Sequence, residues 1–282
     1  MMELCQLLGE LGVTASPADA GGCRLEPFPR STWVRQVLGN QDELFLPHPA
    51  DFDELARKLR LALAPQAILF DMDGVMVDVS GSYRRAIEDT VRAFGAELEP
   101  GEVAAAKREG SCNNDWILTH RLLARRGKNP TLAEVTAVFE DLYQGTAEKA
   151  GLRATERLLS ERAWLAGLKL PLAVVTGRPR SDCQRLLDEH ELSPLFAALV
   201  CMEDGPAKPD PAPVRLALQR LGIERAWMIG DTVDDMRAAC AAGALALGVL
   251  APGEDPAITK PALIEAGAIR VLDSLEELET IL

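Results

Sequence analysis

Cysteine is sparse in this sequence, and no two cysteines stand in a C-x-x-C pair. The six thiols are isolated from one another along the chain: Cys5, Cys23, Cys112, Cys183, Cys201 and Cys240. Structural zinc sites and disulfide frameworks need paired or clustered cysteines, so the spacing argues against both. Isolated thiols are typical of buried or half-buried side chains in a reducing compartment, and we therefore expect a cytoplasmic protein.

Long apolar runs are also missing. No stretch approaches the ~20 uninterrupted apolar residues that a membrane-spanning helix requires. The first twelve residues are apolar in places, but they include Glu3 and Glu10 and lack a basic segment, unlike a signal peptide. The sequence therefore predicts no membrane association.

Basic residues are in deficit, with 30 Lys and Arg against 43 Asp and Glu and a net charge of −13. A nucleic-acid partner is disfavoured, because phosphate backbones are bound by clustered Lys and Arg. A small phosphorylated metabolite remains compatible as a partner, since a metal ion and a few local donors can neutralise its charge.

Short apolar runs alternate with amphipathic segments over much of the chain. The runs that we predict to be strands are residues 67–70, 172–175, 197–200, 226–229, 244–249 and 269–272. The main helical patterns between them are residues 181–190, 211–221 and 233–242. This alternation predicts an α/β fold with a doubly wound parallel sheet.

Two parts of the chain depart from that alternation. Residues 82–167 have helical patterns at 83–94, 115–126, 132–150 and 154–166, a block too long for a crossover, so we predict an inserted α-helical cap. Residues 1–65 are predicted to form a small N-terminal α/β appendage, with extended segments at 24–28 and 33–38 and a helix at 51–63. Residues 66–81 and 168–282 would then make the catalytic core.

Polar residues follow the first two runs directly. Asp71 and Asp73 stand two residues apart, so their side chains leave the strand on the same side, and Gly74 permits a tight departure of the backbone. At Thr176 and Gly177, a hydroxyl and backbone N–H groups next to a helix N-terminus predict a phosphate cradle. The ligand crevice of an open α/β sheet lies outside the carboxyl ends of its strands, so we expect one shared cavity.

Further charged residues follow later in the chain. Lys208 precedes a proline-led helix and predicts a positioned cation. Asp231 and Asp235 add carboxylates after the fourth run, whereas Asp234 is better explained as a partner of the helix dipole. Arg178 leaves two alternatives open: contact with the phosphate, or a solvated position in its loop.

A cavity lined by several carboxylates needs a cation. The carboxylates concerned are those of Asp71, Asp73, Asp231 and Asp235. Two like charges ~4 Å apart repel by roughly 4 kcal/mol at an effective dielectric constant of ~20. Carboxylate oxygens favour Mg²⁺. With Lys208 and Thr176 on the phosphate oxygens, Asp71 is the carboxylate aimed at phosphorus, where attack gives an aspartyl-phosphate.

In this order, the four segments resemble motifs I to IV of the haloacid dehalogenase (HAD) superfamily, and the helical insertion resembles the C1 cap of its subfamily I phosphatases. The resemblance covers about residues 67–282. It implies that Asp71 is the nucleophile and a metal ligand. It implies that Asp73 is general acid and then base, with its backbone carbonyl on the metal. The remaining implied roles are phosphate binding by Thr176 and Lys208 and magnesium binding by Asp231 and Asp235, the latter directly or in support of a ligand.

Asp73 also narrows the reaction. The dehalogenases and phosphonatases of the superfamily lack an acid two residues after the nucleophile, whereas cleavage of a phosphate ester needs one to protonate the leaving alkoxide and activate water. We therefore predict a phosphatase acting on a small phosphorylated metabolite. The alternatives are a phosphosugar mutase with the same core and, disfavoured by Asp73 and the cap, a non-enzymatic phospho-acceptor like a receiver domain.

Two segments outside the core carry further hypotheses. The polar loop at 107–116 resembles the cap specificity loop, with Arg108, Asn113, Asn114 and Trp116 as candidate substrate contacts. Its structural alternative is an Asn or Asp helix cap followed by a buried Trp.

Residues 7–63 resemble the C-terminal small domain of a fold-type I aminotransferase, such as histidinol-phosphate aminotransferase. The residues that carry this resemblance are Gly12, Val13, Arg24, Trp33, Val34, Arg35 and Gly39, with the closing helix. The lysine that binds pyridoxal phosphate lies in another part of such proteins, so that cofactor is not implied. We expect this appendage to serve homodimerisation or docking.

Overall fold

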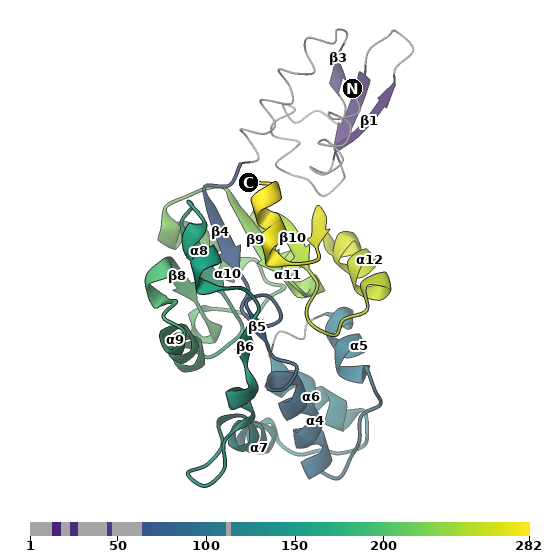
Figure 1. The fold of residues 1–282 in the computed structure, drawn as a ribbon. Helices are drawn as coiled ribbons and strands as arrows, with labels where there is room; N and C mark the ends of the chain where they lie inside the picture. The colour runs from purple at the N-terminus through teal and green to yellow at the C-terminus, as the bar shows by residue number, and fades with distance from the viewer. Residues whose placement is uncertain (1–12, 18–22, 28–43, 47–63, 111–113) are drawn as a thin grey trace.

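The computed structural model describes residues 13–17, 23–27, 44–46, 64–110 and 114–282 (Figure 1). Its largest element is a six-stranded sheet with the order β11-β10-β9-β4-β7-β8, in which every adjacent pair is parallel. The strands are β4 (Ala67–Phe70), β7 (Leu172–Val175), β8 (Phe196–Val200), β9 (Ala226–Gly230), β10 (Leu245–Val249) and β11 (Arg270–Leu272). The predicted doubly wound parallel sheet is confirmed, and its strand order reverses between β4 and β9.

Apart from Arg270 in β11, the strands are apolar, because both faces of the sheet are covered. Successive side chains of a strand point to opposite faces. Ile68 and Phe70 accordingly belong to one buried cluster and Leu69 to the other. The first cluster includes side chains of α9, and the second includes side chains of α10, α11 and α12. These helices are α9 (Arg180–Glu189), α10 (Ala212–Leu221), α11 (Val233–Ala242) and α12 (Pro256–Ala266).

A group of helices lies beyond the carboxyl end of β4 (Figure 1). They are α4 (Tyr83–Ala93), α5 (Glu102–Glu109), α6 (Asp115–Ala124) and α7 (Leu132–Gln144), and α4 packs against α6 and α7. The short antiparallel strands β5 (Val77–Asp78) and β6 (Arg157–Leu158) pair where the chain leaves for these helices and returns. The division of the chain at 82 and 167 stays a prediction.

The end of this helical segment differs from the prediction. Helix α7 stops at Gln144, and residues 154–166 are not one helix but the end of a 3₁₀ turn (Leu152–Thr155), strand β6 and helix α8 (Arg162–Gly167). Gly145 has a φ of +80°, and a Cβ on it would lie 2.2 Å from the backbone nitrogen of Gly151. This close approach of two backbone segments turns the chain where the amphipathic pattern continues. Helices α5 and α12 were not predicted.

Three short strands are described near the N-terminus: β1 (Val13–Pro17), β2 (Cys23–Pro27) and β3 (Leu44–Leu46). They form an antiparallel sheet with the order β1-β2-β3. Strand β2 matches the extended segment expected at 24–28, whereas the segments at 33–38 and 51–63 lie outside the described residues. None of the helices in the described residues has the length and hydropathy to cross a membrane.

Candidate active site

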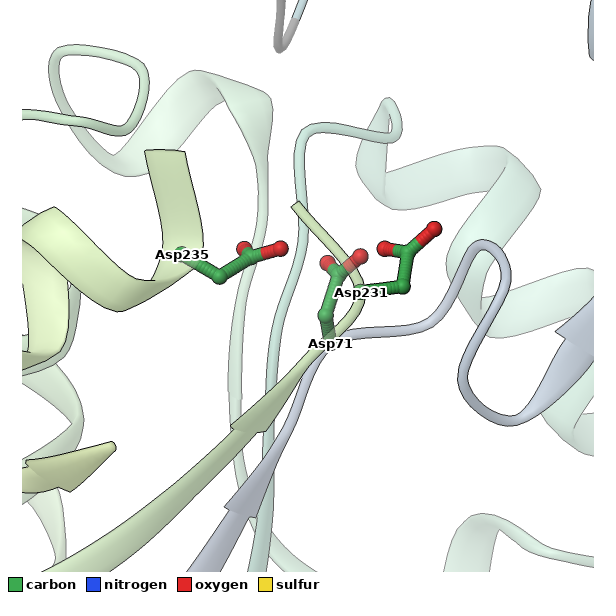
Figure 2. A group of neighbouring side chains, drawn as sticks. All are labelled: Asp71, Asp231 and Asp235. Atoms are coloured by element: carbon green, nitrogen blue, oxygen red, sulfur yellow. The ribbon is translucent and has the colours of Figure 1, made fainter. Parts of the chain in front are cut away.

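Three carboxylates converge beyond the carboxyl ends of the two central strands. Asp71 directly follows β4, Asp231 directly follows β9, and Asp235 lies in the first turn of α11. One ligand oxygen from each lies within 4.8 Å of those of the other two, and Figure 2 shows the carboxylates facing a common space. These strands flank the point where the strand order reverses, which is the usual ligand position in an open α/β sheet.

Two glycines make this convergence possible. Gly74 has a φ of +77°, and a Cβ on it would lie 2.2 Å from Oδ2 of Asp231. A Cβ on Gly230 would lie 2.2 Å from Cβ of Asp235. The glycines of the D-x-D-G and G-D-x-x-x-D segments are therefore required because carboxylates pack against their backbone.

Lys208 joins two of the carboxylates. Its Nζ donates to Oδ1 of Asp71 at 2.7 Å and to the carbonyl of Val175 at 3.0 Å, and it lies 2.5 Å from Oδ1 of Asp235. The other oxygen of Asp235 accepts from the backbone N–H and the hydroxyl of Thr232 at 3.0 and 2.5 Å. Burial lowers the pKa of Lys208, but the charges of Asp235 and Asp71 outweigh the effect of burial and leave the pKa above its ordinary value. Lys208 therefore stays protonated.

The cluster has an excess of negative charge. When ionised, the carboxylates of Asp71, Asp231 and Asp235 carry three negative charges against one on Lys208, which leaves two unbalanced. Burial raises the pKa of Asp71 to about 7, with Lys208 opposing the shift. Burial also raises the pKa of Asp231 well above its usual value, with Asp235 and Asp71 adding to the shift.

The donor set fits a divalent cation. Oδ1 of Asp231 is buried without a hydrogen-bond partner among the described residues. A divalent ion would supply both the missing partner and the two missing charges, and three carboxylate oxygens are ligands that suit Mg²⁺.

Asp73 lies apart from this cluster, although it lines the same cavity as Asp71. Its Oδ1 accepts from Nε of Arg178 at 2.6 Å. The role of its backbone carbonyl as a metal ligand stays a prediction. Arg178 is only 1% exposed, so a solvated position is wrong, and the partner in this structure is a carboxylate.

Thr176 and Gly177 lie at the carboxyl end of β7, next to β4. The backbone N–H of Thr176 donates to Val200, and its hydroxyl accepts from the backbone N–H of Arg178 at 3.1 Å. Gly177 lines the cavity together with Asp71. The expected phosphate cradle therefore stands beside the carboxylate cluster.

Two cations at the same cavity were not anticipated. Arg84 of α4 lies 3.0 Å from Glu254, and Lys107 of α5 lies 3.1 Å from Asp115. Both cations and Asp115 line the cavity with Asp71. In sequence, such residues resemble the solvated face of a helix, and only the position of α4 and α5 over the sheet brings them to the site.

The proposed specificity residues are placed differently from one another. Arg108 lines a neighbouring pocket with Lys107. Asn114 caps α6 by accepting from Ile117 at 3.0 Å, and it also lines a pocket with Thr176, Gly177 and Lys208. The indole N–H of Trp116 donates to Glu140 at 3.0 Å, and Trp116 packs against the core but is half-buried, not buried as its structural alternative expected. Asn113 lies outside the described residues.

Much of the chain is similar to known proteins. Residues 65–243 match the family model of haloacid dehalogenase-like hydrolases. An imidazoleglycerol-phosphate dehydratase of Phytophthora nicotianae is 48% identical over 202 residues, which are 68% of this chain but only 45% of that protein. A phosphoglycolate phosphatase of Yersinia pestis is 31% identical over 66% of this chain and 81% of its own length.

A solved structure also shares the fold. It is a HAD family hydrolase from Deinococcus radiodurans with bound phosphate and sodium, at 26% identity and a TM-score of 0.56. The similarity covers 77% of this chain and 94% of that one.

Proposed function

We propose that this chain, which belongs to the haloacid dehalogenase-like hydrolases through its residues 65–243, is a phosphatase that hydrolyses a small phosphate monoester through an aspartyl-phosphate on Asp71. The observation that supports this most is the meeting of Asp71, Asp231 and Asp235 with Lys208 beyond the central strands. Mg²⁺, held by these carboxylates and the carbonyl of Asp73, would neutralise charge on the phosphoryl oxygens.

The chain's own groups perform two steps. An oxygen of Asp71 attacks phosphorus, the ester P–O bond breaks, and Asp73 gives its proton to the leaving oxygen, so the alcohol departs. In the second step, the oxygen of a water molecule attacks phosphorus while Asp73 takes a proton from that water. The bond between phosphorus and Asp71 then breaks, and inorganic phosphate is released. Thr176, Gly177 and Lys208 bind the phosphoryl oxygens in both steps.

Asp71→Asn tests this proposal directly. The neutral amide is a far poorer nucleophile, so we expect no acid-stable phosphoenzyme after quenching and a loss of phosphate release to background. Wild-type levels of either would contradict the role of Asp71. Phosphate retained on an isomerised sugar would indicate the mutase alternative, and a long-lived phospho-aspartate would indicate the phospho-acceptor.

For the substrate, we infer a phosphate ester that carries an imidazole ring. The relative with 48% identity is named for imidazoleglycerol phosphate, whereas the phosphoglycolate phosphatase has 31% identity. Removal of water from a glycerol phosphate leaves its phosphate ester intact, so the dehydrated compound and its derivatives still offer a bond for a phosphatase. Asp115 at the cavity is an acceptor for a ring N–H or an ammonium group.

A substrate panel tests this second proposal. We expect kcat/KM with Mg²⁺ to be about 10-fold or more higher for histidinol phosphate than for phosphoglycolate or glucose 1-phosphate, the effect of one hydrogen bond to a charged group. Asp115→Asn should reduce that preference and leave p-nitrophenyl phosphate turnover within about 3-fold. A higher kcat/KM for phosphoglycolate would contradict the imidazole substrate and leave the phosphatase proposal intact.

A further inference from the structure

Arg178 is a buried cation that the two steps above do not use. Its side chain has no exposed surface, and its backbone is fixed at both ends. The N–H donates to the hydroxyl of Thr176, and the carbonyl accepts from Met202 at 2.9 Å. The loop of the proposed phosphate cradle therefore also fixes the backbone position from which the Arg178 side chain extends.

One edge of the guanidinium faces Asp73. Nε donates to Oδ1 of Asp73 at 2.6 Å, and Nη2 lies at the same distance from that oxygen. No hydrogen bond to Oδ2 of Asp73 is found among the described residues. The side chain of Asp73 is 23% exposed and lines the cavity, so the arrangement fixes one oxygen and leaves the other for proton transfer.

The opposite side of the guanidinium is held by the segment between β5 and β6. Nη1 donates to Oε2 of Glu156 at 3.0 Å and to the hydroxyl of Tyr143 at 3.3 Å. Oε1 of Glu156 accepts from the hydroxyls of Ser82 and Tyr143 at 2.9 and 3.0 Å. The ring of Tyr83 lies 4.9 Å from Cζ of Arg178. The guanidinium is thus contacted by three further residues, and Ser82 holds one of them, Glu156.

Such an arrangement requires arginine. A planar guanidinium presents donors in different directions at once, whereas a lysine ammonium is a point charge on a flexible stem. Burial of a charge is costly, and a buried ion pair often stabilises a protein no more than apolar side chains of the same volume would. The benefit of burying Arg178 is then the fixed position of its half-buried partner, Asp73.

We propose that Arg178 is a positioning residue that holds the Asp73 carboxylate for proton transfer, with Glu156 holding Arg178 in turn. This rests on the proposed role of Asp73 as general acid and base. If Asp73 is misplaced, departure of a poor leaving group, which needs a proton, slows most, and attack by Asp71 on an activated ester slows least. Leaving-group dependence therefore separates positioning from a general structural role.

The experiment compares Arg178→Met and Arg178→Lys on two esters, p-nitrophenyl phosphate and the best alkyl ester of the panel above. For Arg178→Met we expect kcat on the alkyl ester to fall about 100-fold, the lower end of a general acid–base contribution. Phosphoenzyme formation from p-nitrophenyl phosphate in stopped flow, and KM for both esters, should change less than about 3-fold. Arg178→Lys should recover part of the loss.

Three further variants complete the test. Arg180→Met, at a half-exposed arginine two residues along that pairs with Asp204, should change neither ester. Glu156→Gln keeps Arg178 and the side-chain volume, and it should give the same leaving-group dependence as Arg178→Met with a smaller loss of kcat. This variant keeps the test valid if Arg178→Met folds poorly. Combining Arg178→Met with Asp73→Asn should add little to Asp73→Asn alone, because both act on one proton transfer.

The outcomes are distinct. Equal losses in the rate of phosphoenzyme formation from both esters with Arg178→Met and Glu156→Gln would overturn the positioning role while Asp73→Asn still shows leaving-group dependence in that step. Absence of that dependence in Asp73→Asn would overturn the role of Asp73, and the positioning role with it.

Discussion

Gly74 and Gly253 have nearly the same backbone conformation but different surroundings, so they separate two effects of an added methyl group. Their φ angles are +77° and +79°. A Cβ on Gly74 meets Oδ2 of Asp231 at 2.2 Å and Ala251 at 3.0 Å, whereas nothing lies within 4 Å of a Cβ on Gly253. Alanine at either position pays roughly 1–2 kcal/mol for the left-handed conformation.

We expect Gly74→Ala to lose magnesium affinity in addition, because the Asp231 carboxylate must move. Gly253→Ala should lose only stability. Titration calorimetry with Mg²⁺ and urea unfolding of both variants check this. Equal magnesium affinity in the two would mean that the D-x-D-G glycine serves only the turn.

Single residues also show which parts of the site can be predicted from the sequence and which cannot. The meeting of Asp71, Asp231 and Lys208 could be predicted from their order along the chain, because Asp71 and Asp231 directly follow strands and Lys208 lies shortly before α10. Arg178 could not be assigned, because its partners Asp73 and Glu156 lie 105 and 22 residues away and nothing local marks a buried arginine.

At the scale of elements, the observed helix cap of Asn114 must be separated from the substrate contact predicted for it. Its side chain caps α6 by accepting from Ile117, and it also lines a pocket with Thr176, Gly177 and Lys208. Alanine removes both the cap, at a cost of about 1 kcal/mol, and any contact with substrate. Serine keeps a good capping oxygen but shortens the side chain.

If Asn114 selects the substrate, Asn114→Ser and Asn114→Ala should both lower kcat/KM for the preferred ester by about 5- to 150-fold, the range for one hydrogen bond. Turnover of p-nitrophenyl phosphate should stay within about 3-fold. Thermal unfolding should show a loss of stability mainly in Asn114→Ala. A wild-type kcat/KM for the preferred ester in Asn114→Ser would mean that Asn114 serves only as a helix cap.

Elements were predictable where packing on both sides forces one pattern. Each of the six sheet strands was placed to within one residue, because both faces are covered and the strand must be apolar throughout. The helices predicted within residues 145–167 were wrong, because an amphipathic pattern continues through a turn made by the close approach of Gly145 and Gly151. That contact depends on packing that the local pattern does not record.

At the scale of the whole molecule, the carboxylate cluster links stability, pH and metal. The pKa of Asp71 rises from 3.8 to about 7 in the folded protein. Without metal, the folded state then binds more protons than the unfolded chain between about pH 4 and 7, so the free energy of unfolding should fall as pH rises through this range. Magnesium binds the ionised carboxylates, so below pH 7 it must displace the proton of Asp71.

We therefore expect Mg²⁺ to raise Tm more at pH 8 than at pH 5.5. At 100 times its Kd, the ion adds about 2.7 kcal/mol, or roughly 5–10 °C for a domain of this size. At pH 5.5, displacing the proton of Asp71 costs about 1.4 kcal/mol per pH unit below its pKa, so the same Mg²⁺ concentration should raise Tm by less than half as much.

Scanning fluorimetry at both pH values, after dialysis against EDTA, gives the two shifts in Tm. Phosphate release measured alongside should be absent until Mg²⁺ is restored. Asp231→Asn should lose the shift at both pH values, because a ligand is removed whatever the protonation of Asp71. An equal shift at pH 5.5 and 8 in the wild type would mean that Asp71 is already ionised at pH 5.5 without metal, and the raised pKa assigned to Asp71 would be wrong.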